Sequence, residues 1–229
     1  MNSSRVHLER WNAKFAAAIP ADSLVLDAGA GPQPYRHLLG HTRYEAADFE
    51  QVDKKYAKST YVCDLLDIPV EDERFDYVIC NQVLEHLPEP LAALKELNRV
   101  LKRGGKAIFT MPLFYEEHEQ PYDFYRYTQF AHRFLFERAG FQIVSLEWME
   151  GYLGTVAYQM DTASHYLPIA PRHVGGGLIG LIAAPFLAML KGTCRVAAAV
   201  LYRLDIRHRY TGTGFPKNYV VIAAKPWAR

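Results

Sequence analysis

The octapeptide Leu24-Val25-Leu26-Asp27-Ala28-Gly29-Ala30-Gly31 joins a run of apolar residues to an acid and two closely spaced glycines. Consecutive apolar residues are typical of a parallel strand that is covered on both faces. The glycines allow a sharp turn and let the backbone approach a ligand without a side chain in the way. In open α/β sheets, the carboxyl end of such a strand borders the crevice that binds nucleotide-like ligands. The octapeptide therefore predicts a strand, a turn and a ligand site, in that order.

Strand-like and helix-like runs alternate on both sides of this octapeptide, which favours a mostly parallel sheet with helices on both faces. We expect a first helix that Ser3 or Ser4 caps and Pro20 ends. A helix over 90–101 should end at Gly104-Gly105, and another should run from Thr128, its N-cap, to Ala139. A short helix is expected over 35–39. The expected strands cover 24–27, 44–47, 61–63, 77–80, 106–111, 142–148 and 219–224.

The pattern divides the chain into four parts. These are an N-terminal helix over 1–20, a ligand-binding core over 21–150, an apolar insertion or lid over 151–216, and a final core strand over 217–229. The apolar runs of the insertion, 178–190 and 196–202, are shorter than the roughly 20 residues that cross a bilayer. We expect helices that form a lid, a homodimer contact or a peripheral membrane contact over 174–209.

Composition narrows the class of protein. Half of the 229 residues are hydrophobic and 22% are charged, as in a folded globular chain. A formal net charge of +1 gives no electrostatic reason to expect nucleic acid as a partner. The three cysteines and the scattered histidines show no metal-ligand spacing, so we expect no metal site. The N-terminus lacks the apolar core of a signal peptide, and we expect a cytoplasmic protein.

Acidic residues follow the next two strands. Asp48 ends the second expected strand, where a carboxylate can bind both hydroxyls of a ribose. Asp64, after the third, can accept a hydrogen bond from an adenine amino group while Leu65 packs on the ring. The segment Pro32-Gln33-Pro34 follows the glycine turn and lacks two of the N–H groups that would bind phosphate. The motifs together favour a nucleoside ligand without phosphates.

Five motifs occur in the order found in one family: LDAGAG, the acid Asp48, CDLLDIP, FDYVICNQVLEHL and LKELNRVLKRGGKAIFTMP. The chain thus resembles class I S-adenosylmethionine-dependent methyltransferases, in the subgroup of small-molecule and quinone-pathway enzymes. The resemblance implies a Rossmann-like α/β fold with a seven-stranded, mostly parallel sheet and helices on both faces. The apolar helical insertion would come before the last strand.

The resemblance also implies roles for particular residues. Gly29 and Gly31 would border the methionine part of S-adenosylmethionine, and Asp27 would orient their loop. Asp48 would bind the ribose, Asp64 and Leu65 the adenine, and Asn81 would line the pocket near the sulfonium.

The loop 112–128 follows the fifth strand and is rich in aromatic and titratable residues. In this fold it borders the transferred methyl group, and His118 is a candidate general base at neutral pH. Asp123 would orient His118 or pair with Arg126. His86 is a second candidate, with a structural hydrogen bond as its favoured role.

The preferred function is therefore S-adenosylmethionine-dependent methylation, with O-methylation favoured, of a small molecule that has apolar bulk. A polyketide, a quinone precursor or a lipid-linked sugar would fit. Two alternatives stay open at this point: a nicotinamide-dependent oxidoreductase, and a non-catalytic methyltransferase-like module that binds a membrane or a partner.

Overall fold

A computed structural model of the chain describes residues 2–227, which form two compact units. The larger unit consists of residues 8–149 and 218–227, and the smaller of residues 2–7 and 150–217. The boundary falls within the first helix, α1 (Ser3–Ala17), and directly before the last strand.

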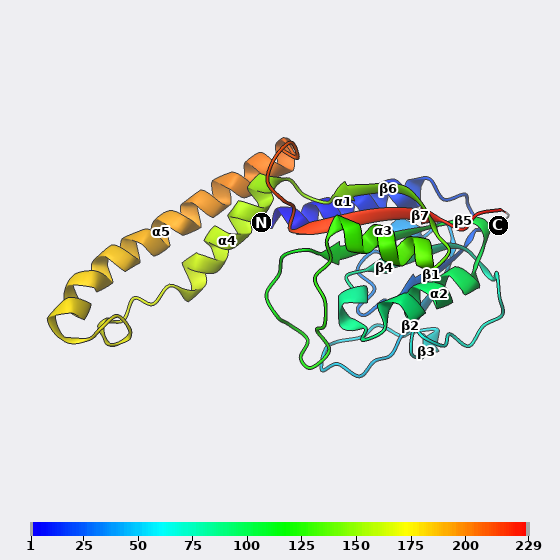
Figure 1. Cartoon of the computed structure of the whole chain (residues 1–229), viewed down its shortest axis with the longest axis horizontal. Coiled ribbons are helices and arrows are strands. Elements are labelled where there is room, and N and C mark those ends of the chain that lie inside the picture. Colours follow the sequence, from blue (N-terminus) through cyan, green and yellow to red (C-terminus); the bar gives the residue numbers. More distant parts are fainter. Residues whose placement is uncertain (1, 228–229) are drawn as a thin grey trace. The chain divides into compact units, whose positions relative to one another are not determined.

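The larger unit contains a seven-stranded sheet in the order β3-β2-β1-β4-β5-β7-β6 (Figure 1). The first five strands run parallel, whereas β7 runs antiparallel to both β5 and β6. This confirms the predicted seven-stranded, mostly parallel sheet. The strands are β1 (Leu24–Ala28), β2 (Arg43–Asp48), β3 (Tyr61–Val62), β4 (Phe75–Asn81), β5 (Leu101–Pro112), β6 (Gln142–Trp148) and β7 (Asn218–Ala224).

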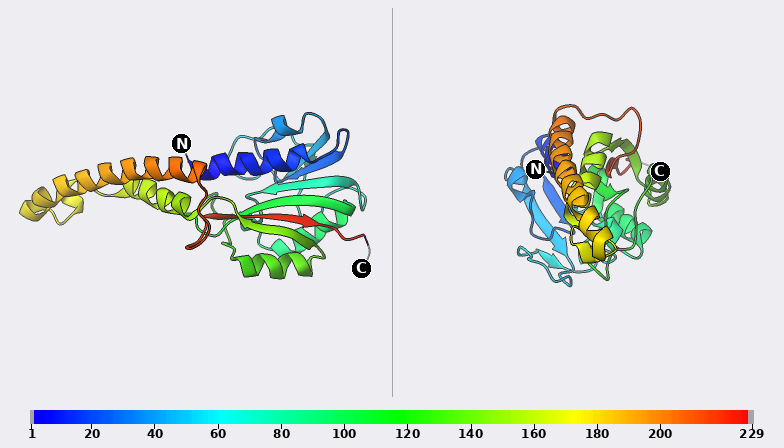
Figure 2. Two further views of the ribbon diagram at one scale, coloured as in Figure 1. Left: turned by 90° about the horizontal axis from the view of Figure 1, so that it is seen from above. Right: turned by 90° about the vertical axis from the view of Figure 1, so that its left-hand side faces the viewer.

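Both faces of the sheet are covered, which explains why all five residues of β1 are buried. On one face, Phe15 and Ile19 pack against Val25 of β1 and Ile79 of β4. On the other face, α2 (Pro90–Val100) and α3 (Gln129–Arg138) complete the main apolar core (Figure 2). This three-layer packing leaves the ends of the strands as the place for polar side chains.

The polar end of β1 lies inside this packing. Asp27 is 4% exposed, and the Tyr44 hydroxyl of β2 donates a 2.6 Å hydrogen bond to its Oδ2. Burial raises the pKa of the Asp27 carboxyl to about 6, and the charge of Asp48 adds to the shift while the Tyr44 hydrogen bond opposes it.

The expected end of the second long helix was wrong. Helix α2 ends at Val100, and β5 begins at Leu101, so Gly104-Gly105 does not end the helix. The two glycines lie in β5, where its register with β4 shifts and Gly104 has a φ of 75°. They form a bulge, a second structure that favours glycine as strongly as a helix end does.

The start of α1 also differs from expectation. The side-chain Oδ1 of Asn2 accepts a 2.9 Å hydrogen bond from the backbone N–H of Ser4, so Asn2 is the cap and Ser3 already lies in the helix. The Thr128 cap of α3 is confirmed, since its hydroxyl accepts a 3.2 Å hydrogen bond from the N–H of Ala131. The expected helix over 35–39 is a single 3₁₀ turn, η1 (Arg36–Leu39).

The smaller unit is mostly a pair of helices, α4 (Tyr152–Tyr166) and α5 (Gly177–Arg207), joined through the short η3 (Pro171–His173). Helix α5 runs without a break through Pro185, so the two expected apolar runs form one helix. Ala157 of α4 packs against Ala198 and Tyr202 of α5 in a small core. The carboxylate of Asp205, which is 0% exposed, accepts a 2.9 Å hydrogen bond from the N–H of Gly151.

The core contacts of α2 lead to a first prediction. Replacing the fully buried Leu97 with alanine should lower the free energy of unfolding by about 2–5 kcal/mol, because it removes apolar contacts and leaves a cavity. Lys95→Ala is the matched control, since Lys95 is exposed on the same helix and should change stability by less than about 0.5 kcal/mol. Urea unfolding measures both, and equal midpoints would contradict the packing described here.

The raised pKa of Asp27 leads to a second prediction. The native state holds this proton up to about pH 6, whereas the unfolded state releases it near 3.8. The contribution of Asp27 to stability is therefore fully present below pH 3.8 and is lost as the pH rises through 6. Between pH 4 and 7 the wild type should lose up to about 3 kcal/mol relative to Asp27→Asn in urea unfolding. Parallel pH profiles of the two proteins would contradict the shift.

Candidate functional site

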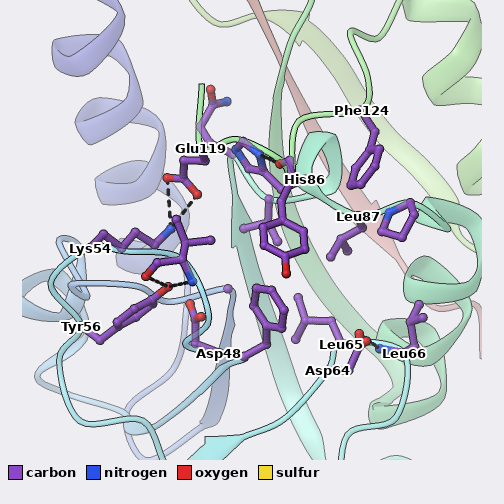
Figure 3. Close-up of a pocket in the computed structure, with 17 residues that line it drawn as sticks. Asp48, Lys54, Tyr56, Asp64, Leu65, Leu66, His86, Leu87, Glu119 and Phe124 are labelled. Carbon is purple, nitrogen blue, oxygen red and sulfur yellow. Dashed lines mark hydrogen bonds and ion pairs between the residues drawn. The ribbon is translucent and has the colours of Figure 1, made fainter. Parts of the chain in front are cut away.

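A cavity lies beyond the carboxyl ends of β1, β2 and β4, within the larger unit (Figure 3). This is the end of a parallel sheet at which ligands of α/β proteins bind. The segments that follow β1, β2, β3 and β4 supply most of its wall, and the loop after β5 supplies the rest. Four of the seven residues expected to bind the cofactor line this cavity: Gly29, Asp48, Asp64 and Leu65.

Asp48 connects the glycine turn to the end of β2. Its Oδ2 accepts a 2.8 Å hydrogen bond from the N–H of Gly31, and its Oδ1 accepts a 3.1 Å hydrogen bond from the N–H of Glu50. The side chain is buried but borders the cavity. Because each carboxylate oxygen has two lone pairs, each keeps one for a ligand hydroxyl.

Two features of the structure require glycine at position 29. Its φ is 74°, and a Cβ built on it would lie 2.4 Å from a methyl carbon of Val83. Both residues line the cavity, so the absent side chain allows the turns after β1 and β4 to approach each other. Gly31 is different, because a Cβ on it would meet nothing within 4 Å, although its φ of 50° still favours glycine.

Three expected cofactor residues are not among those that line the cavity: Asp27, Gly31 and Asn81. The carboxylate of Asp27 accepts a hydrogen bond from the hydroxyl of Tyr44. The side-chain amide of Asn81 donates a 2.9 Å hydrogen bond to Asn12 Oδ1, and its own Oδ1 accepts a 3.0 Å hydrogen bond from Thr110. Asp27 and Asn81 therefore fix the framework behind the cavity.

One ion pair of the cavity was missed by the sequence reasoning. The ammonium of Lys54 lies 2.9 Å from a carboxylate oxygen of Glu119, which joins the segment after β2 to the loop after β5 (Figure 3). The two residues are 65 positions apart in the sequence, so no local spacing pattern predicts the pair. The ionisable wall of the cavity thus contains the acids Asp48, Asp64 and Glu119 and the single lysine, beside His86.

The catalytic candidates lie close together. His86 lines the cavity, whereas His118 is not among the lining residues and packs against the His86 ring, with the two ring centres 4.7 Å apart. Both contacts suggested for Asp123 occur, since its carboxylate lies 3.3 Å from His118 Nδ1 and 2.7 Å from Arg126. Arg126 holds the pKa of Asp123 well below its usual range. Burial lowers the pKa of His86 and favours its neutral form.

Apolar side chains form part of the cavity wall. Phe49 and Tyr122 meet edge to face with ring centres 5.4 Å apart. Leu87 and Phe124 also line the cavity (Figure 3). Gln82, whose φ is 55°, also borders the cavity and has a buried side-chain NH₂ without a hydrogen-bond partner among the described residues. None of these residues was singled out by sequence reasoning as part of the pocket.

Part of the chain is similar to known proteins. The family model described as "Methyltransferase domain" matches residues 26–109, the segment that contains the glycine turn, Asp48, Asp64 and His86. A demethylmenaquinone methyltransferase of Staphylococcus carnosus is 39% identical over 67 residues. That match covers 27% of this chain and 28% of the relative, so the chain spans well under half of that curated protein.

Solved structures agree over longer stretches at lower identity. Phosphoethanolamine N-methyltransferase 2 of Haemonchus contortus, in complex with S-adenosyl-L-methionine, superposes with a TM-score of 0.55 and 17% identity. The match covers 98% of this chain and 52% of that protein. The 1,6-didemethyltoxoflavin-N1-methyltransferase of Burkholderia thailandensis, solved with S-adenosylhomocysteine, gives 0.51 at 18% identity and covers 64% and 71% of the two chains. The matched sequence segment and the shared fold agree: residues 26–109 resemble a methyltransferase domain, and the chain shares its fold with solved methyltransferases.

Proposed function

We propose that the chain is an S-adenosylmethionine-dependent methyltransferase. The observation that carries the proposal is the charge of the cavity: three carboxylates against one ammonium that is already paired with one of them. Such a wall suits a cationic ligand and repels phosphates. S-adenosylmethionine carries a sulfonium and no phosphate, and when bound it supplies the methyl group.

The lining residues fit the parts of this ligand. Asp48 offers one free lone pair on each oxygen for the two ribose hydroxyls. Asp64 uses one oxygen to hold the N–H of Leu66, 3.0 Å away, and keeps the other for an adenine amino group. The buried Leu65 side chain would pack on the adenine ring, and the turn at Gly29 would border the methionine part.

The nicotinamide alternative fits less well. Dinucleotide-binding sheets have the strand order 3-2-1-4-5-6, whereas here the antiparallel β7 lies between β5 and β6. Pro32 and Pro34 remove N–H donors directly after the glycine turn, where a pyrophosphate would need them.

We favour O-methylation of a small molecule with apolar bulk. The wall formed by Phe49, Leu87, Tyr122 and Phe124 would hold the apolar part. The hydroxyl would meet the imidazole of His86, which packs against His118, and Asp123 orients His118. Since His86 and not His118 lies on the wall, the pair replaces the single base favoured from the sequence. The remaining work of the site is to position the acceptor and exclude water.

Calorimetric titration with S-adenosylhomocysteine tests the cofactor assignment. Asp48→Asn and Asp64→Ala should each weaken binding about tenfold or more, because each removes a hydrogen bond to a charged acceptor. Asp67→Ala is the matched control, since Asp67 is exposed nearby and does not line the cavity. Equal affinities in all four proteins would refute the assignment, and binding of NAD without S-adenosylhomocysteine would favour the oxidoreductase.

We also propose that α5 rests on an anionic membrane surface of the cytoplasm. Most of its apolar side chains are exposed, among them Leu178, Ile179, Leu181, Ile182, Phe186, Met189, Val196 and Val200. The chain has no Asp or Glu from residue 162 to 204, whereas Arg172, Lys191, Arg195 and Arg203 fall in this stretch. An apolar surface with only basic charges complements anionic lipid headgroups.

The geometry of α5 favours contact over crossing. It is the one helix among the described residues that is long and apolar enough to span a bilayer. Its uncharged part, 177–190, is about 21 Å long at 1.5 Å per residue, against roughly 30 Å of hydrocarbon. At 100° per residue, positions 178, 182, 189, 196 and 200 lie within about 40° of one another, which forms one stripe along the helix.

Sedimentation with vesicles tests this contact. The full chain should bind vesicles that contain phosphatidylglycerol and should bind pure phosphatidylcholine far more weakly. The double variant Ile182→Glu, Phe186→Glu should bind at least about tenfold less, because two inserted side chains are lost. Phe130→Glu is the control, since Phe130 is 73% exposed on α3 of the larger unit. A homodimer that the double variant breaks, without vesicle binding by the wild type, would refute the membrane contact.

A further inference from the structure

Glu85 is a buried acid whose carboxylate has no hydrogen-bond partner in any other residue that the structure describes. It lies in the 3₁₀ turn η2 (Leu84–His86) after β4, and its exposure is 0%. Neither carboxylate oxygen accepts a hydrogen bond from another of the described residues. Leaving such a group unpaired costs about 1–3 kcal/mol or more, so its presence calls for an explanation.

Two imidazoles lie next to this carboxylate, and both are oriented through Nδ1. His86 Nδ1 donates to the carbonyl oxygen of Tyr122, 2.5 Å away. His118 Nδ1 donates to the carbonyl oxygen of Glu116 at 3.2 Å and lies 3.3 Å from Asp123 Oδ2. In the neutral rings, each Nε2 therefore keeps an unshared electron pair.

The three side chains converge. One ligand atom from each of Glu85, His86 and His118 lies within 4.8 Å of the other two. Donors around one ion, at about 2.0–2.2 Å each, lie up to roughly 4.2 Å apart, so a displacement of less than about 1 Å brings all three into range. We propose that these three residues bind a divalent transition-metal cation beside the acceptor end of the cavity.

The surroundings match those of a metal site. Ligand histidines usually donate their other N–H to a carbonyl or a carboxylate, as both histidines do here. Asp123 is held in turn by two hydrogen bonds from Arg126, of 2.7 and 2.8 Å. The backbone N–H of Phe124 donates a 2.8 Å hydrogen bond to the carbonyl oxygen of Glu85, which ties the loop after β5 to η2.

The donor set selects the class of ion. Two imidazoles and one carboxylate favour Zn²⁺, Co²⁺, Fe²⁺ or Mn²⁺ over Mg²⁺ and Ca²⁺, which take oxygen ligands. Three protein ligands leave positions open, as in catalytic metal centres. This inference rests on the proposed function and deepens it. With His86 and His118 as ligands, a metal that binds the acceptor hydroxyl would lower the pKa of that hydroxyl, so that its proton leaves to solvent water and the alkoxide accepts the methyl group.

Metal titration of the full chain tests the proposal. Co²⁺ alone is added and followed through its visible absorption bands, and Zn²⁺ alone is titrated by calorimetry. Wild type should bind one ion, and Glu85→Gln and His118→Ala should each weaken binding at least tenfold. His37→Ala is the control, because His37 is an exposed histidine outside the cluster and should leave binding unchanged.

The outcomes separate this proposal from the cofactor assignment. If Glu85→Gln does not fold, as judged by circular dichroism, His118→Ala gives the same test, since the His118 side chain is 30% exposed. Absence of binding at 100 μM Co²⁺ and Zn²⁺, or equal binding by the wild type and both variants, overturns the metal site. If the free cysteines bound the metal, the wild type and both variants would bind it equally. None of these results changes the S-adenosylhomocysteine titration, which tests the donor site by itself.

Discussion

The carboxylate of Asp48 fixes the ends of two strands relative to each other, and the proposed binding site of the methyl donor depends on it. By accepting N–H groups from Gly31 and Glu50, it fixes the turn after β1 against the segment after β2. The turn after β4 then fits against Gly29 only because that residue has no side chain. Three loops from three neighbouring strands therefore meet around one buried acid. The same oxygens that hold the framework also border the cavity, so stability and recognition share a single group.

Much of the larger unit was predictable because its signals are local. Runs such as Leu24-Val25-Leu26 are apolar on both faces, and the structure buries them in the middle of the sheet. The prediction became ambiguous where two kinds of local structure favour the same residue type. Gly104-Gly105 suits the end of a helix and a strand bulge equally, and only the pairing of β4 with β5 selects the bulge. Pro185 suggested an interruption, yet a helix of 31 residues passes through it.

The site divides in the same way. Gly29, Asp48, Asp64 and Leu65 were identified because each follows a strand at a fixed place in a motif. Lys54, Tyr122 and Glu119 were missed because they reach the cavity from segments whose positions depend on the whole fold. Asn81 was expected in the pocket from its place at the end of β4, but Asn12 and Thr110 hold its amide behind the wall. A residue type and a strand end predict location, whereas orientation depends on long-range partners.

The ion pair between Lys54 and Glu119 has a consequence for the rate at which ligands enter and leave the cavity. Both side chains are about one third exposed, at 34% and 28%, so dissolved salt screens their attraction. An exposed pair of this kind contributes at most about 1 kcal/mol, far less than the packing of the core. The two segments that it joins can therefore separate without disturbing the sheet. Exchange of a ligand that passes between these two segments should accordingly become faster as ionic strength rises.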